Sequence, residues 1–167
     1  NSPSQHPAGL AFDGSFLWIS DNTTRKIYKI DPATGSVDQE IDLPVTVLNN
    51  GILPLGGLAW DGSHLWCGLI AGWSSRISQL TEQGKVKKFY FTKGYPLGVE
   101  SDGKSLWTIT DNGGLRSGIL YQYDISTGLY VTHFDTPCEF PVGLAYDGQY
   151  FWTIDREKNV VLKLKIK

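Results

Sequence analysis

Three aspartates, Asp21, Asp111 and Asp155, occupy nearly equivalent places in this chain of 167 residues, each directly after a short apolar run. Carboxylate oxygens that recur in this way could bind Ca²⁺, which prefers oxygen ligands. The same side chains could instead cap the loop that follows them, in an Asx turn. The sequence therefore predicts no cofactor and assigns no metal ligand, with calcium as the alternative.

Other polar and aromatic residues fall in loops that we expect on the same side of the molecule. Carboxylates, guanidinium groups and an aromatic ring together suit a polar ligand. No nucleophile stands in a recognisable arrangement with a base, so the catalytic residues stay unknown. The predicted ligand-binding residues are Asp21, Arg25, Asn50, Trp73, Arg76, Asp111, Asn112, Arg116, Asp155 and Arg156.

A fourfold repeat must position these loops. Its motif is Gly-Leu-Ala-aromatic-Asp-Gly followed by Leu-Trp or Phe-Trp, and the four copies start 48, 41 and 45 residues apart (57 − 9, 98 − 57 and 143 − 98). A period near 45 residues, filled with short strand-like runs, is typical of a β-propeller. The copies read GLAFDGSFLW from Gly9, GLAWDGSHLW from Gly57, GVESDGKSLW from Gly98 and GLAYDGQYFW from Gly143.

Each repeat predicts one blade of four antiparallel strands. In the first repeat the strands are Leu10–Phe12, Phe16–Ser20, Lys26–Ile30 and Ser36–Leu43, and Asp13-Gly14 forms the first hairpin. The fold class is therefore all-β, a β-propeller built from four repeats of four-stranded antiparallel blades. We expect a single domain over residues 1–167, with blades at roughly 7–43, 55–91, 96–134 and 141–167. The last blade lacks its outer strand in the sequence.

The repeated aspartates and tryptophans are predicted to build the blades rather than to bind a ligand. Each turn aspartate stands beside a glycine, which marks a tight hairpin. Each tryptophan follows five residues later, where a large flat ring can fill the space between two blades. A ligand cage of aromatic rings is the alternative for the tryptophans. The residues are Asp13, Asp61, Asp102 and Asp147 with Trp18, Trp66, Trp107 and Trp152.

The repeats resemble the blades of NHL- and YVTN-like propellers, and are especially similar to those of bacterial glutamine cyclotransferase-like propeller proteins. The resemblance rests on Pro-x-Gly-Leu-Ala-x-Asp-Gly-x-x-Leu-Trp and on Ile-Tyr-Lys-Ile-Asp-Pro-x-Thr-Gly. It implies the fold. It leaves two functions open: a binding or scaffold module that recognises a ligand or partner through the loop face, or a propeller enzyme of lactonase, lyase or cyclotransferase type. No catalytic residue of that family maps onto a matching motif here.

Bulk properties narrow the range of partners. A net charge of −2 gives no basic face for nucleic acid, and no run reaches the 18 apolar residues of a membrane span.

Cys67 and Cys138 are too few for a disulfide framework, so we expect two free thiols, with a bridge as the alternative. The absence of Met and the sequon Asn22-Thr23-Thr24 favour a secreted or periplasmic protein, although no signal peptide is visible.

The missing outer strand leaves three ways to complete the ring. A homodimer could form a larger propeller, four blades could close by themselves, or the chain could be part of a longer propeller. A homodimer and a small polar ligand or partner protein are the expected partners.

The Asp-Gly turns yield a first prediction. Gly62→Val should destabilise the protein by about 1 kcal/mol or more, because a β-branched residue opposes the positive φ of a tight hairpin. Urea unfolding measures this, and an unchanged free energy of unfolding would count against the hairpin.

Overall fold

The computed structural model describes residues 3–43, 47–48, 51–52, 54–111 and 117–166. Nearly all regular structure in these residues is β-strand, and one short 3₁₀ helix, η1 (Gly72–Ser74), interrupts the second repeat. Within the described ranges no helix is long and apolar enough to cross a membrane.

The strands form three four-stranded sheets, one three-stranded sheet and one small two-stranded sheet, so the predicted fold class is confirmed. Each sheet is an antiparallel meander in sequence order, and neighbouring strands are joined by short turns. Blade 1 contains β1 (Pro7–Phe12), β2 (Leu17–Asp21), β3 (Lys26–Ile30) and β4 (Val37–Asp42); blade 2 contains β7 (Leu55–Trp60), β8 (Leu65–Leu69), β9 (Arg76–Leu80) and β10 (Val86–Phe91); blade 3 contains β11 (Gly98–Ser101), β12 (Ser105–Asp111), β13 (Gly118–Asp124) and β14 (Tyr130–Asp135); blade 4 contains β15 (Pro141–Tyr146), β16 (Phe151–Asp155) and β17 (Val160–Leu164).

The connection between blades 1 and 2 is more structured than the sequence predicted. It holds a small hairpin of β5 (Val47–Leu48) and β6 (Gly51–Ile52), between the first two expected blades at 7–43 and 55–91.

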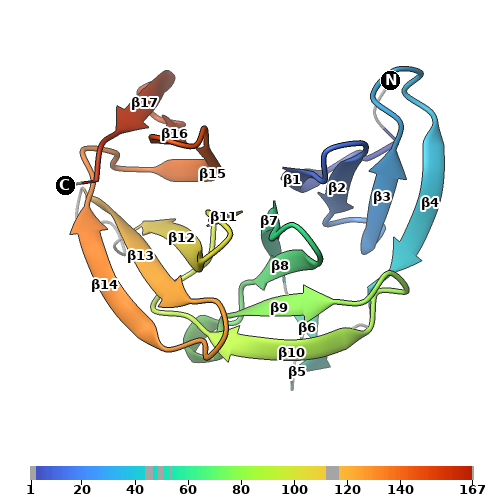
Figure 1. Ribbon diagram of the computed structural model, residues 1–167, viewed down its shortest axis with the longest axis horizontal. Helices are drawn as coiled ribbons and strands as arrows, with labels where there is room; N and C mark the ends of the chain where they lie inside the picture. The colour runs from blue at the N-terminus through green and yellow to red at the C-terminus, as the bar shows by residue number, and fades with distance from the viewer. Residues whose placement is uncertain (1–2, 44–46, 49–50, 53, 112–116, 167) are drawn as a thin grey trace.

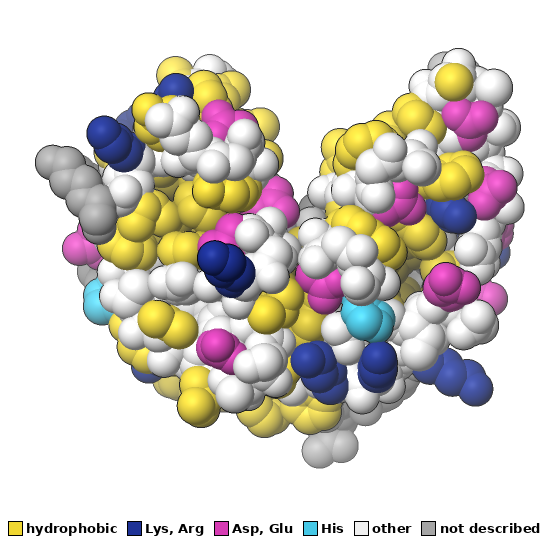
Figure 2. Space-filling model, in the orientation of Figure 1, with side chains coloured by type: hydrophobic (Ala, Val, Ile, Leu, Met, Phe, Trp, Pro, Cys, Tyr) yellow, Lys and Arg dark blue, Asp and Glu magenta, His cyan; other side chains and the backbone are white. Residues whose placement is uncertain are grey.

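The blades stand side by side around an open arc (Figure 1). Their first strands, β1, β7, β11 and β15, line the inside of the arc, and blades 1 and 4 stand at its two ends. A hollow separates these ends in the space-filling view (Figure 2). The described part of the N-terminal segment, from Pro3 on, does not cover β17, because Ser4 and His6 bind Asp21 within blade 1 instead.

One hydrogen-bond pattern builds the inner hairpin of every blade. In blade 1, Oδ1 of Asp13 accepts the backbone N–H groups of Ser15 and Phe16 at 2.8 and 2.7 Å. The other oxygen, Oδ2, accepts the indole N–H of Trp18 at 2.7 Å. The same carboxylate-to-indole bond recurs at 2.7–2.8 Å in the other three blades. The turn interpretation of these aspartates is therefore confirmed, and Gly62 has the expected positive φ of 94°.

Trp18, Trp66 and Trp107 pack between blades, as predicted. The prediction is wrong for Trp152, which is partly exposed and belongs to none of the buried clusters, because no described blade follows blade 4. We call the side of a blade that meets the next blade its forward face, and the opposite side its backward face. In blade 1 the forward face carries Ala11, Trp18 and Ile27, which form one buried cluster with the backward-face residues Leu58 and Leu65 of blade 2. Blades 2 and 3, and blades 3 and 4, join through equivalent clusters.

Glycine lets the inner strands approach one another. A Cβ atom on Gly9 would lie 2.6 Å from the backbone nitrogen of Leu58, and one on Gly98 would lie 2.6 Å from the carbonyl carbon of Gly143. Real Cβ atoms do not come so close. The glycines that open the first three motifs, Gly9, Gly57 and Gly98, are therefore needed for blade-to-blade packing.

Both cysteines are buried and free, as expected. Cys67 packs in the cluster between blades 1 and 2, and burial raises the pKa of its thiol to about 12. It therefore behaves as a small apolar residue of the core.

The clusters predict that replacing two equivalent tryptophans lowers the free energy of unfolding by different amounts. Trp107→Ala should cost about 3–5 kcal/mol, because this ring is buried against Phe151 with a centroid separation of 4.7 Å. Trp152→Ala breaks the same kind of aspartate–indole bond but removes a partly exposed ring, so it should cost at least about 1 kcal/mol less. Urea unfolding of both variants gives the comparison. Equal losses would mean that the hydrogen bond, rather than the packing, carries the effect.

Candidate ligand-binding site

The ends of β2 and β16 place Asp21 and Asp155 on the face of the arc where the predicted loops lie. Both side chains are fully buried. Asp21 accepts four hydrogen bonds, from the Ser4 hydroxyl at 2.6 Å and from the N–H groups of His6, Thr23 and Thr24. The carboxylate thus ties the chain before β1 to the loop after β2.

Asp155 does the same in blade 4. It accepts the N–H groups of Glu139, Glu157 and Lys158 at 2.8, 3.1 and 3.1 Å. Burial alone would raise the pKa of both aspartates, but the hydrogen bonds outweigh burial and hold each pKa below its usual range. These two residues cap their loops and present no free oxygen to a ligand.

Calcium gains no support from this geometry. Across the described ranges, no group of three or more His, Cys, Asp or Glu side chains could hold a metal ion. Asp21 and Asp155 lie on blades 1 and 4, the opposite ends of the arc in Figure 1.

The three predicted arginines that the structure describes lie on three different blades. Arg25 follows β2 with a positive φ of 62°. The Arg76 guanidinium lies 5.1 Å from the ring centroid of Phe89, and that of Arg156 lies 5.8 Å from the ring centroid of Phe140. These contacts fit cation–π interactions within the protein. Asn50, Asn112 and Arg116 lie outside the described residues.

Two predicted residues, Trp73 and Asp111, do come together. They line one pocket with a volume of about 650 Å³ between blades 2 and 3. Its walls come from η1, from the connection between β10 and β11, and from the end of β12. The other described lining residues are Gly72, Thr92, Lys93, Gly94, Tyr95, Thr110 and Tyr121.

A buried serine fixes the wall that carries Trp73. The Ser75 hydroxyl donates to the Gly72 carbonyl at 2.8 Å and accepts the Ala71 N–H at 2.9 Å. Gly72 adopts a positive φ of 57°, which favours glycine. The loop is therefore held on both sides of Trp73, whose side chain is fully exposed.

The opposite wall is tied to the end of β12. The Thr110 hydroxyl accepts the Tyr95 N–H at 3.2 Å, and the backbone N–H of Lys93 donates to the Tyr123 hydroxyl at 2.8 Å. The Lys93 ammonium lies 4.7 Å from the ring centroid of Tyr130, at the distance of a cation–π interaction. The ammonium of Lys93 and the carboxylate of Asp111 thus border a pocket with aromatic walls.

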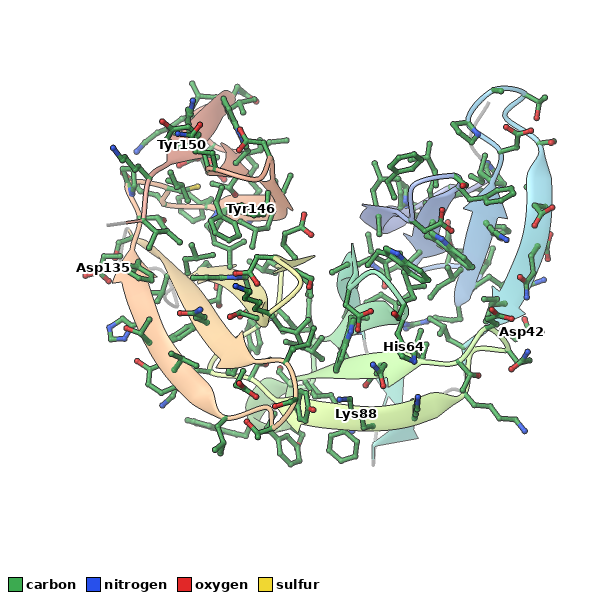
Figure 3. The ribbon with its side chains drawn as sticks, viewed as in Figure 1. Asp42, His64, Lys88, Asp135, Tyr146 and Tyr150 are labelled. Carbon is green, nitrogen blue, oxygen red and sulfur yellow. The ribbon has the colours of Figure 1, made fainter. Side chains whose placement is uncertain are left out.

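Lys93 and Tyr95 were missed in the sequence analysis, and so was Glu100. Lys93 and Tyr95 belong to no motif, so only the structure identifies them. Glu100 had a visible signal, because it replaces the alanine of the Gly-Leu-Ala motif in the third repeat. Its carboxylate accepts the Ser101 N–H at 2.8 Å and, across the blade boundary, the Tyr146 N–H at 3.1 Å. Tyr146 lies on the inner strand of blade 4 (Figure 3).

Comparison with solved structures supports the class of protein that the fold defines, a β-propeller. The chain is similar to a glutaminyl cyclase from Myxococcus xanthus (TM-score 0.74, 14% identity, 95% of this chain and 65% of that chain). It is also similar to hydrazine synthase from Kuenenia stuttgartiensis (0.60, 18%, 99% and 51%) and to the computationally designed protein Ika4 (0.58, 13%, 98% and 93%). The chain therefore spans about two thirds of the cyclase and half of the synthase.

At these identities the likeness shows the fold alone. No family model matches the sequence, and no curated protein matches it significantly. The recognition of a propeller similar in style to glutamine cyclotransferase-like proteins is confirmed at the level of structure.

Glu100 gives a pH-dependent prediction. Burial raises its pKa from 4.5 to about 7, so the folded state holds a proton that the unfolded chain has lost between these values. Stability should therefore be full below about pH 4.5 and fall as the pH rises towards 7, by about 1–3 kcal/mol. Urea unfolding from pH 4 to pH 8 measures this loss.

Two variants isolate the effect. Glu100→Gln cannot ionise, and Glu100→Ala restores the residue found in the other three repeats. Both should remove this part of the pH dependence. A slope that persisted in both would assign it to another group.

Proposed function

We propose that this protein is a binding module that recognises a small zwitterionic ligand, such as a free amino acid or a short peptide, in the pocket between blades 2 and 3. The single observation that supports this most is that Trp73, Lys93 and Asp111 border one pocket. An aromatic surface, a cation and an anion match the three parts of such a ligand.

Each side chain has a distinct role in this proposal. The exposed ring of Trp73 stacks on an apolar or aromatic group of the ligand, and Tyr95 extends this surface. Asp111 accepts hydrogen bonds from the ligand ammonium, and Lys93 pairs with its carboxylate. Ser75 and Thr110 hold the two walls in place, which lowers the entropic cost of binding.

An enzyme of lactonase, lyase or cyclotransferase type is the second candidate. The likeness to the Myxococcus xanthus glutaminyl cyclase favours it. Against it, the described pocket lining contains no pair of side chains that would act together as nucleophile and base. Incubation with peptides that begin with glutamine should therefore yield no pyroglutamate above the uncatalysed rate, as measured by mass spectrometry. Turnover that Asp111→Asn abolishes would establish the enzyme instead.

The binding proposal predicts a specific pattern of losses. Calorimetric titration with the dipeptide Gly-Phe should detect 1:1 binding. Trp73→Ala and Asp111→Asn should each weaken it about tenfold, which corresponds to about 1.4 kcal/mol. Leu129→Ala, which trims an exposed apolar side chain outside the pocket, should leave the affinity unchanged.

Blocked ligands test the two charged contacts separately. Acetylated Gly-Phe lacks the ammonium, so Asp111→Asn should not change its affinity. Gly-Phe amide lacks the carboxylate, so Lys93→Gln should not change the affinity for this ligand. An unchanged affinity in Trp73→Ala, or no binding of any zwitterionic dipeptide, would refute the proposal.

A further inference from the structure

The forward face of blade 4 exposes a position that the other blades bury. Val161 on β17 pairs with Ile154 on β16. By the register of the repeats, its equivalents are Ile27, Ile77 and Leu120. Val161 is 65% exposed, whereas these three residues are 0%, 0% and 1% exposed. Nothing of the described chain packs where a following blade would stand.

The backward face of blade 1 shows the reciprocal feature. Leu10 follows the first glycine of its motif, as Leu58 and Val99 do in blades 2 and 3. Leu10 is 60% exposed, whereas Leu58 and Val99 are 2% and 1% exposed. In those two blades the residue is covered by the preceding blade, and blade 1 has no preceding blade.

The glycines of the inner strands also show that blade 4 has no neighbour on its forward side in the described chain. Gly9, Gly57 and Gly98 each press against the backbone of the next inner strand, but a Cβ atom on Gly143 would meet nothing within 4 Å. The inner strand of blade 4 therefore lacks the neighbour that its three equivalents have.

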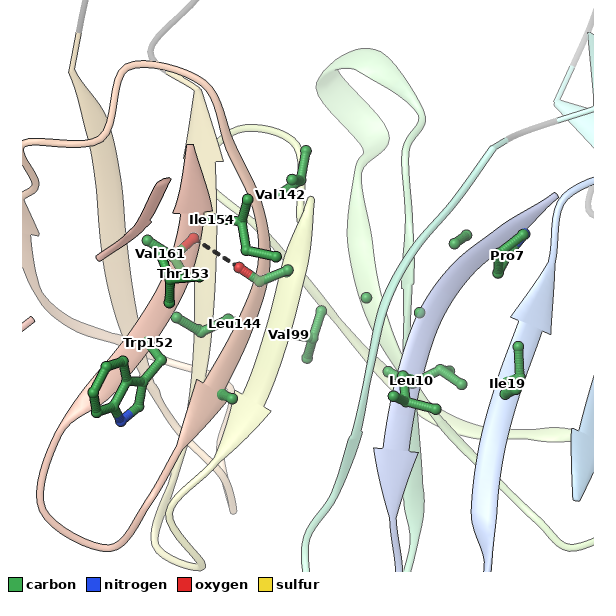
Figure 4. Close-up of a pocket in the computed structure, with 17 residues that line it drawn as sticks. Pro7, Leu10, Ile19, Val99, Val142, Leu144, Trp152, Thr153, Ile154 and Val161 are labelled. Atoms are coloured by element: carbon green, nitrogen blue, oxygen red, sulfur yellow. Dashed lines mark hydrogen bonds between the residues drawn. The ribbon is translucent and has the colours of Figure 1, made fainter. Parts of the chain in front are cut away.

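The two unpaired faces border one apolar cavity of about 610 Å³ on the inside of the arc (Figure 4). Trp152, Ile154 and Val161 lie on one side of it, and Leu10 and Ile19 lie on the other. One side is a forward face and the other is a backward face. These are the two kinds of surface that meet at each of the three internal boundaries.

We propose that the space between blades 4 and 1 is a docking site for one further blade, supplied by a protein segment that carries a single copy of the same repeat. Its backward face would cover Trp152, Ile154 and Val161, and its forward face would cover Leu10 and Ile19. The site continues an interface that the chain already forms three times, which is why a blade fits it.

The curvature of the arc favours one blade over a second copy of the chain. The four blades curve so that blades 1 and 4 face each other across the hollow (Figures 1 and 2). A second copy would bring four blades to this space, so the arc would have to open to admit them. A single blade demands no such change.

The chemistry of the partner follows from the existing boundaries. Its inner strand must begin with glycine, because the inner strands touch through their backbones at this position. The next residue must be leucine or valine, to meet Trp152 as Leu58 meets Trp18. Its second strand must carry a tryptophan on the side that meets Leu10.

The test extends the intact chain at its C-terminus by a second copy of residues 43–91, which comprise the second repeat and the connection that precedes it. The appended blade should raise the melting temperature by several degrees. It should also reduce the fluorescence of anilinonaphthalene sulfonate, since Leu10 and Val161 become covered. A matched extension in which the appended copies of Leu58 and Trp66 are serine should do neither.

Val161→Asp decides whether the blade docks in the proposed place. Because Val161 is largely exposed, this variant should leave the original chain about as stable as before, yet it should abolish the gain from the appended blade. An equal gain with Val161→Asp would overturn the proposal. It would also be overturned if the original chain sedimented as a dimer that Val161→Asp dissociates, since a second copy would then occupy the site.

Discussion

The hydrogen bond from a tryptophan indole to the carboxylate of its own hairpin turn is the interaction on which this fold depends. A tryptophan between two sheets buries much apolar surface but carries one N–H group that would be costly to leave unpaired. The turn aspartate accepts that N–H with one oxygen and closes the hairpin with the other. The local turn and the packing between blades are thus fixed by the same side chain. In Asp147, where the carboxylate is exposed, the bond to Trp152 is the largest cause of the lowered pKa.

This arrangement gives every blade two different faces, and the difference explains both the stability and the incompleteness of the arc. A forward face with alanine and tryptophan meets a backward face with leucine, while glycine brings the inner strands close. Such contacts occur only between neighbours, so stability accumulates boundary by boundary, as in other repeat proteins. A blade at either end keeps one face uncovered, as the exposure of Leu10 and Val161 shows.

The sequence predicted the parts of the fold that are local. The Asp-Gly hairpins, the strands of each blade and the burial of Trp18, Trp66 and Trp107 follow from short-range patterns, and the structure agrees with them. The sequence did not predict the open arc, because the angle between neighbouring blades depends on how their whole faces pack. Nor could it separate Asp21 and Asp155, which serve their own blades, from Asp111, which borders a pocket. That distinction depends on η1 and the Lys93–Tyr95 segment, which form the other walls of the Asp111 pocket. They belong to blade 2 and to the connection before blade 3, so the pattern around Asp111 does not reveal them.

The same repeat limits where chemistry can occur. Most residues that recur between blades already have structural partners: the turn aspartates hold indole and backbone N–H groups, and Asp21 and Asp155 hold loop N–H groups. Apart from Asp111, the residues proposed to recognise a ligand therefore depart from the repeat. Trp73 stands in a loop whose sequence does not recur in the other repeats, Lys93 lies between motifs, and Glu100 replaces a small alanine at a blade boundary. Because the repeat carries the stability, these positions are free to vary, and binding can change without loss of the fold.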